Sequence, residues 1–168
     1  SEVAERIDQP PSTVHRLLHS MAARGIVESD PATQAWNIGP ATFRLGSAFM
    51  RRSGIVERAR PILQALMKHT GETANLGILN GDAVLFVSQA ETQETIRAFF
   101  PPGTRSPLHA SGIGKALLAF GRPETLQAYL DGASLVCFTE RTLATPDALT
   151  ADMARIRSRG FSFDDEER

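Results

Sequence analysis

Residues 10–18 read PPSTVHRLL, and the pair Arg24–Gly25 follows a few positions later. Proline disfavours the α conformation at the residue before it and is tolerated in the first turn of a helix, so a helix should begin at Pro10 or Pro11. Gly25 is a helix stop, which predicts that this helix runs to about Arg24. The residues before Asp8 are expected to form the end of another, shorter helix.

The predicted helix has two different faces. Its apolar side chains recur with the i, i+3, i+4, i+7 spacing of a buried stripe, and its polar side chains repeat that spacing on the other side. The residues expected to be buried are Val14, Leu17, Leu18 and Met21, and those expected to be exposed are Ser12, His15, Arg16 and His19.

A β-hairpin is expected after this helix. Two strand-like runs, at residues 26–28 and 35–38, flank the turn-forming sequence SDPATQ at 29–34. A short helix, a turn, a polar-faced helix and a hairpin in this order are typical of a winged helix-turn-helix, whose second helix can lie in the major groove of double-stranded DNA. Arg16 suits a guanine edge or a phosphate, and Ser12 and Thr13 suit phosphates at the helix N-terminus. The residues expected to contact DNA are Pro11, Ser12, Thr13, His15, Arg16, His19, Thr33 and Gln34.

The charge of this region favours two copies on one duplex. Over residues 1–39, the arginines Arg6, Arg16 and Arg24 are outnumbered by the acidic residues Glu2, Glu5, Asp8, Glu28 and Asp30. Phosphate neutralisation supplies most of the non-specific affinity for DNA, so one copy should bind weakly and a homodimer is expected. A short predicted helix then carries the apolar stripe Ala41, Leu45, Ala48 and Phe49, which would either pair two copies or pack within its own domain.

The rest of the chain predicts an α+β domain. A helix at 55–69 precedes strand-like runs at about 73–79, 83–89 and 95–100, and helices are expected at 112–120, 123–130 and 146–159. Phe161 is expected to begin a final strand. No internal repeat is present.

The sequence SGIGK at residues 111–115 suggests a ligand site. Ser111 can cap a helix, and the free N–H groups of Gly112, Ile113 and Gly114 would form a positive site that suits the carboxylate of a small organic acid. The alternative is that the glycines only permit close helix–sheet packing.

Several enzymatic and metal-binding interpretations fail. A phosphate-binding loop would need glycine at His109 and serine or threonine at Ala116, and a zinc protease helix would need glutamate at Arg16. Cys137 and His109 lack an orienting partner, so no catalytic residue, cofactor or metal is expected and His109 is interpreted as structural. The acidic run at 164–167 is typical of a solvated strand end.

Four motifs together resemble the IclR family of bacterial transcription regulators. They are PPSTVHRLL at 10–18 with Arg24–Gly25, TGETANL at 70–76, PLHASGIGKALLA at 107–119 and RGFSFDDEE at 159–167. Their order and spacing match the family over essentially the whole chain. The resemblance implies an α+β fold with a winged helix-turn-helix at 1–39, a linker helix at 40–54 and a GAF-like effector-binding domain at 55–168, an antiparallel sheet with flanking helices. Both end domains are expected to be incomplete.

The resemblance also implies a function. Many family members are repressors that respond to a small-molecule effector, bind an inverted-repeat operator and assemble as dimers or dimers of dimers. Thr95, Ala98, Ser106 and Asp164 fall at positions where family members contact the effector. Together with the helix-start residues, the expected effector-binding set is Thr95, Ala98, Ser106, Ser111, Gly112, Ile113, Gly114 and Asp164.

Composition agrees with such a regulator. The chain has 168 residues, 42% hydrophobic residues and a formal net charge of −1, with a single cysteine and no apolar run long enough to span a membrane. We therefore expect a cytoplasmic regulator with no membrane association. The alternative is an enzyme acting on small organic acids with an appended helix-turn-helix, which would require a nucleophile and base in the pocket.

Overall fold

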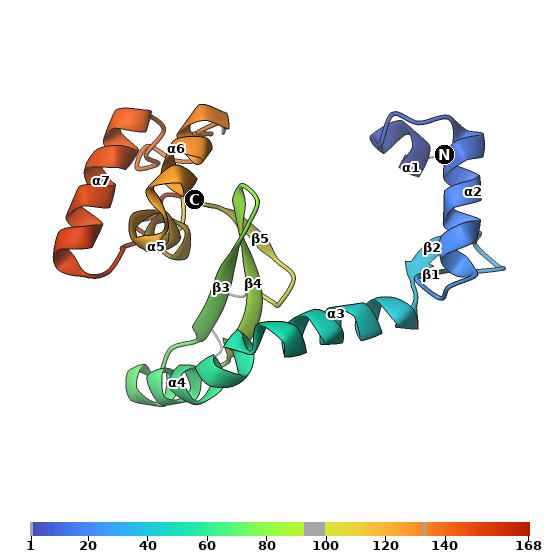
Figure 1. The fold of residues 1–168 in the computed structure, drawn as a ribbon, viewed down its shortest axis with the longest axis horizontal. Helices are drawn as coiled ribbons and strands as arrows, with labels where there is room; N and C mark the ends of the chain where they lie inside the picture. Colours follow the sequence, from blue (N-terminus) through green and yellow to red (C-terminus); the bar gives the residue numbers. More distant parts are fainter. Residues whose placement is uncertain (1, 93–99, 133) are drawn as a thin grey trace. The chain divides into compact units, whose positions relative to one another are not determined.

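The computed structural model describes residues 2–92, 100–132 and 134–168 and divides into two compact units, Ser1–Ile55 and Val56–Arg168 (Figure 1). The first unit contains α1 (Glu2–Arg6), α2 (Pro11–Ala22), the antiparallel pair β1 (Val27–Ser29) and β2 (Trp36–Ile38), and α3 (Pro40–Ser53). The predicted short helix, second helix and hairpin are therefore confirmed. In α2, Pro10 is the N-cap residue and Pro11 opens the first turn, as the sequence predicts.

The predicted apolar stripe of α2 is only partly buried. Val14 is 2% exposed and Leu18 is half-buried, but Leu17 is 53% exposed and Met21 is also exposed. The prediction that Leu17 and Met21 are buried is wrong. Within the described residues, α2 packs mainly against β1 and the five-residue α1, which are too short to cover the whole stripe.

Helix α3 is attached at its start and uncovered along its length. The Ala41 N–H donates to the carbonyl of Gly25 at 2.9 Å, and the Thr42 hydroxyl donates to the carbonyl of Ile26 at 2.8 Å. A Cβ at Gly39 would lie 2.3 Å from the Gly25 carbonyl oxygen, so only glycine permits this approach. None of the α3 residues is buried, and Phe43 and Leu45 are 80% and 60% exposed.

The second unit consists of one sheet and four helices among its described residues. It contains α4 (Ile55–Thr70), the strands β3 (Ala74–Asn80), β4 (Ala83–Ala90) and β5 (Arg105–Pro107), then α5 (Gly112–Phe120), α6 (Pro123–Gly132) and α7 (Pro146–Arg159). The sheet is antiparallel, in the order β3-β4-β5. The mixed α+β class is confirmed.

Two strand predictions need comment. The strand expected at 95–100 falls almost entirely outside the described residues. The strand expected from Phe161 does not form, because the described residues offer this stretch no neighbouring strand and the carbonyl of Phe161 accepts from Arg159 Nε at 2.6 Å instead. The short strand β5 was not predicted, and its proline is tolerated because it lies at the sheet edge.

The core of this unit forms where α5 meets α7, α6 and the sheet (Figure 1). Its central residues come from β4, from the segment before α5 and from all three helices: Val84, Phe86, Leu108, Leu118, Ala119, Tyr129, Leu149, Met153 and Ile156. This packing fixes the N-terminal turn of α5 beside the sheet.

Candidate functional site

Helix α2 presents the polar face that the sequence predicts. Ser12, His15, Arg16 and His19 are all exposed, whereas Thr13 is half-buried. The N-cap residue is Pro10 and makes no side-chain hydrogen bond to the first turn. Pro11 has no N–H, and the Thr13 N–H donates to the Pro10 carbonyl at 3.0 Å, so the Ser12 N–H is the donor that this helix start keeps for an anion.

The two histidines of α2 form a cluster with the hairpin. The rings of His15 and His19 lie 4.0 Å apart between centroids, and His19 contacts Trp36 of β2 edge-on at 5.3 Å. His19 Nδ1 also lies 3.0 Å from the carbonyl oxygen of His15. Part of the predicted DNA-facing surface therefore also holds α2 against the hairpin.

The hairpin tip is ordered by Asp30. Its carboxylate accepts hydrogen bonds from the Ala32 N–H and the Thr33 hydroxyl, both at 2.8 Å, and these bonds lower the pKa of Asp30, the Thr33 bond most strongly. Gln34 adopts a positive φ of 58° and its N–H donates to the Asp30 carbonyl. The Thr33 hydroxyl is thus used within the turn, whereas Gln34 is exposed.

Including α3 changes the charge balance of the first unit. Residues 1–39 carry more acidic than basic side chains, but α3 adds Arg44, Arg51 and Arg52 and no acid. Arg24, Arg44 and Arg51 also line one groove of about 610 Å³ whose remaining walls include Ile26 and Leu45.

The N-terminus of α5 is built differently from that of α2. The Ser111 hydroxyl accepts from the Gly114 N–H at 3.1 Å and donates to the Pro107 carbonyl at 2.9 Å. The cap is confirmed, but it occupies the Gly114 N–H, so the expectation that this group is free is wrong. A Cβ at Gly114 would lie 2.3 Å from the Leu108 carbonyl oxygen, which makes Gly114 a packing glycine. Only Gly112 and Ile113, of the three expected donors, keep an N–H without an intrahelical partner.

A cavity of about 510 Å³ opens at this helix start. Its apolar wall includes Phe86 and Phe100, whose rings are stacked 5.0 Å apart. The residues lining it are Asn75, Phe86, Phe100, Ser106, Ala110, Ser111, Gly112, Ile113, Asp164 and Arg168. The structure thus brings together five of the eight predicted effector residues, namely Ser106, Ser111, Gly112, Ile113 and Asp164. Thr95 and Ala98 lie outside the described residues.

Two polar residues of this cavity were not predicted. Arg168 Nη1 donates to the Ser106 hydroxyl at 3.2 Å, and the Arg168 guanidinium lies 5.6 Å from the Phe138 ring centroid. Asn75 Oδ1 is buried and has no hydrogen-bond partner within the described part of the chain. The cavity therefore combines donors at one end, aromatic walls and the acceptor oxygens of Asn75 and Asp164.

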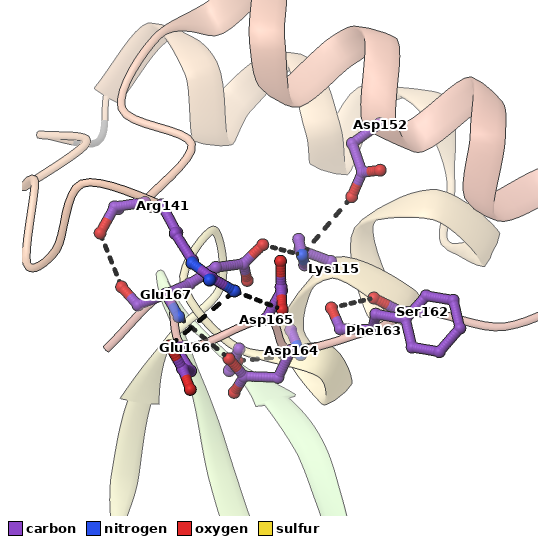
Figure 2. Close-up of polar contacts among 12 residues, drawn as sticks. Lys115, Arg141, Asp152, Ser162, Phe163, Asp164, Asp165, Glu166 and Glu167 are labelled. Carbon is purple, nitrogen blue, oxygen red and sulfur yellow. Dashed lines mark hydrogen bonds and ion pairs between the residues drawn. The ribbon is translucent and has the colours of Figure 1, made fainter.

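A buried ionic cluster lies behind this helix start (Figure 2). Lys115 of α5 pairs with Glu167, to which its Nζ donates, and lies 3.5 Å from Asp152 Oδ2 of α7. Burial raises the pKa of Glu167, although the hydrogen bond from Lys115 and its charge oppose the shift. The expectation that residues 164–167 form a solvated strand end is wrong for Glu167, which is 4% exposed.

His109 has the structural role that the sequence analysis gave it. Its Nδ1 lies 2.7 Å from the Tyr129 hydroxyl and its Nε2 lies 3.0 Å from the carbonyl oxygen of Val136. Both ring nitrogens are engaged, and Cys137 Sγ faces the carbonyl of Thr139 at 3.1 Å. Among the described residues there is no cluster of metal-ligating side chains, and none of the helices has the length and apolarity required to cross a bilayer.

Two family models match the chain. The IclR helix-turn-helix domain matches residues 1–31, and the model described as bacterial transcriptional regulator IclR C-terminal matches residues 47–168. The HTH-type transcriptional regulator BhcR of Paracoccus denitrificans is 67% identical over the whole chain, and the transcriptional repressor IclR of Escherichia coli K12 is 37% identical over 99% of it. The chain spans 60% and 62% of the length of these two relatives.

A solved structure shows the same fold. The chain resembles an IclR homologue from Microbacterium hydrocarbonoxydans, crystallised in complex with 4-hydroxybenzoate, with a TM-score of 0.76 and 27% identity. The match covers 94% of this chain and 65% of the homologue.

Proposed function

The chain belongs to the IclR family of bacterial transcriptional regulators, and from this premise we propose that it is a DNA-binding repressor controlled by a small carboxylate. The observation that carries the proposal is the cavity at the start of α5, which joins hydrogen-bond donors to aromatic walls in a chain that also presents the exposed polar face of α2. The family consists of regulators rather than enzymes. Repression follows the E. coli relative, which is named a transcriptional repressor.

DNA recognition is assigned to α2 and the hairpin tip. Arg16 reaches a guanine edge or a phosphate, the hydroxyl and backbone N–H of Ser12 hold a phosphate, and Gln34 contacts the backbone from the hairpin. Two copies would bind an inverted repeat, joined by the uncovered apolar side chains of α3. Such a protein acts in the cytoplasm, where the chromosome lies.

Effector recognition is assigned to the cavity in the second unit. A carboxylate would accept hydrogen bonds from the Gly112 and Ile113 N–H groups and pair with Arg168. The stacked rings of Phe86 and Phe100 would cover the apolar body of the ligand, and Asp164 would accept from a hydroxyl group on it. The related protein that holds 4-hydroxybenzoate, a carboxylate with an aromatic body and a hydroxyl, supports this class of ligand.

The two activities are linked by differential affinity. A ligand changes operator binding only as far as it prefers one arrangement of the paired recognition helices over the other, typically by about 1 to 3 kcal/mol of coupling.

The test is selection of genomic DNA fragments by the purified protein near physiological salt, with and without acetate, succinate and 4-hydroxybenzoate. We expect enrichment of one inverted-repeat site and a change in enrichment with at least one acid. Absence of any enriched site would remove the DNA-binding proposal, and steady turnover of an acid by the protein would favour the enzyme alternative.

A further inference from the structure

One buried lysine holds two carboxylates that come from different parts of the second unit (Figure 2). The side chains of Lys115, Asp152 and Glu167 are at most 7% exposed. Burying three charges is costly unless they pair, and removing one partner leaves the other uncompensated. The cluster therefore constrains where the segments that carry these residues can lie.

The two carboxylates depend on Lys115 to different degrees. Asp152 also pairs with Arg155 at 3.2 Å and lies 3.9 Å from Arg159, both on its own helix. Glu167 pairs with Lys115 and with no other cation among the residues described, although each carboxylate has one oxygen without a hydrogen-bond partner there, Asp152 Oδ2 and Glu167 Oε2. Loss of the Lys115 interaction would thus release Glu167 far more than Asp152.

Glu167 belongs to the acidic segment, residues 164–168, which is fastened at several points. The Thr142 hydroxyl donates to the Glu167 carbonyl at 2.6 Å, and the Thr139 hydroxyl donates to the Glu166 carbonyl at 2.7 Å. The Glu167 N–H faces Asp164 Oδ1 at 3.4 Å. Glu167 supplies the buried anchor of this segment.

The acidic segment also forms part of the effector cavity. Asp164 and Arg168 line the cavity, whereas Lys115 and Glu167 do not. The backbone of Asp164 lies beside the start of α5, since a Cβ at Gly112 would be 3.5 Å from the Asp164 nitrogen, an ordinary contact distance. Lys115 lies three and four residues beyond Gly112 and Ser111, on the same side of the helix. The anchor and the cavity wall are therefore one helical turn apart.

We propose that Lys115 and Glu167 are positioning residues for the effector cavity. They hold the acidic segment against α5 and so set where Asp164 and Arg168 stand, without touching the ligand themselves. This inference rests on the proposed effector site. It predicts that breaking the Lys115–Glu167 pair weakens effector binding, because Asp164 and Arg168 are then displaced from the cavity wall.

The test compares Glu167→Gln with Asp152→Asn in the full chain. Both substitutions remove one buried carboxylate from the same lysine, but only the first lies in the acidic segment. Hydrogen–deuterium exchange is measured across residues 161–168, and circular dichroism confirms folding. We expect Glu167→Gln to raise exchange in this segment at least tenfold and Asp152→Asn to leave it near wild type.

The second measurement is calorimetric binding of acetate, succinate and 4-hydroxybenzoate to the same proteins. The dissociation constant of any acid that binds the wild type should rise about tenfold in Glu167→Gln and less than twofold in Asp152→Asn, even if both variants melt at similarly lowered temperatures. Glu167→Asp, which keeps the charge, should recover part of the affinity.

Each outcome has a defined meaning. Equal exchange at residues 161–168 in the two variants would show that Glu167 does not anchor the acidic segment. Faster exchange in Glu167→Gln with an unchanged affinity for the acids would show that the anchor does not position the cavity wall. If no acid binds the wild type, the proposed carboxylate effector fails, while the exchange comparison still decides whether Glu167 anchors the segment.

Discussion

Helices α2 and α5 start in opposite ways, although both N-termini are assigned to anion recognition. The start of α2 has a proline at the N-cap, no side-chain cap and an exposed polar face. The start of α5 is capped by Ser111 and buried against the segment that precedes it. The side chains of a DNA-binding surface can become ordered when they contact the duplex, whereas a small ligand requires a cavity that is already formed.

The surroundings of the two helices differ in the same way. The buried apolar side chains of the first unit, within its described residues, are Ala4, Val14 and Val27. The second unit buries a cluster that includes Leu118, Leu149, Met153 and Ile156. Substitutions at α5 should therefore change stability and ligand binding together, whereas substitutions on the exposed face of α2 should change DNA binding alone.

The largest effect is expected at Gly114. Gly114→Ala places a Cβ 2.3 Å from the Leu108 carbonyl oxygen and 2.5 Å from Leu108 Cα, which are backbone atoms that cannot move aside. We expect the free energy of unfolding of the second unit to fall by about 3 kcal/mol, at the upper end for overpacking. Gly112→Ala is the matched control, because its nearest new contact is 3.5 Å, and should cost less than about 1 kcal/mol. Similar denaturation curves for the two variants would contradict the packing role.

Arg16→Ala tests the other side of the comparison. Loss of a base or phosphate contact should weaken operator binding by about 1 to 3 kcal/mol while thermal stability stays near wild type, because the side chain is exposed. Salt titration separates the two roles: a phosphate contact reduces the salt slope, and a base contact relaxes specificity at one position. Arg6→Ala, on α1, is the control. Equal losses in both variants would remove Arg16 from recognition.

The sequence predicts features that depend on neighbouring residues, such as where a helix begins and ends. The sequence predicts the bounds of α5 and α7, and in the structure Ser111 caps α5 and an αL glycine, Gly160, ends α7. The exposure of Leu17 could not be read, since it depends on how much of α2 its neighbours cover. The Lys115–Glu167 pair joins residues 52 positions apart, and nothing in either local sequence indicates the other.

The candidate site shows the same division. Ser111, Gly112 and Ile113 line the cavity as predicted, because a cap and the N–H groups beside it are local features. Arg168 and Asn75 were missed because only tertiary packing brings them to the helix start. The Gly114 N–H was misjudged for a local reason: the cap that Ser111 provides consumes that donor.

Ser111→Ala sharpens the comparison at the level of one hydrogen bond. Loss of an N-cap costs typically about 1 kcal/mol, so the melting temperature should fall modestly. The Thr145 hydroxyl caps α7 in the same way, since it accepts from the Ala148 N–H at 3.3 Å. Thr145→Ala removes this cap and should lower stability by a similar amount. Of these two capping residues, Ser111 lines the cavity and Thr145 does not. Calorimetry with the three acids should therefore show weaker acid binding in Ser111→Ala than in Thr145→Ala. Equal acid affinities in both would argue that the cap has no role in binding.

The smallest expected effect is the pH dependence that Glu167 adds to the second unit. Burial raises the pKa of this carboxyl in the folded chain, so between its unfolded and folded pKa values the folded state binds more protons than the unfolded state. The stability that protonated Glu167 contributes is therefore complete below the unfolded pKa and is lost as pH rises through the folded pKa. Glutamine does not titrate, so the free energy of unfolding of the wild type relative to Glu167→Gln should increase as pH falls from 7.5 towards 5. Urea denaturation at several pH values measures this difference, and the carboxylates other than Asp152 and Asp164, which face Glu167, cancel between the two proteins. A difference that shrinks on acidification would mean that Lys115 outweighs burial in setting the pKa of Glu167.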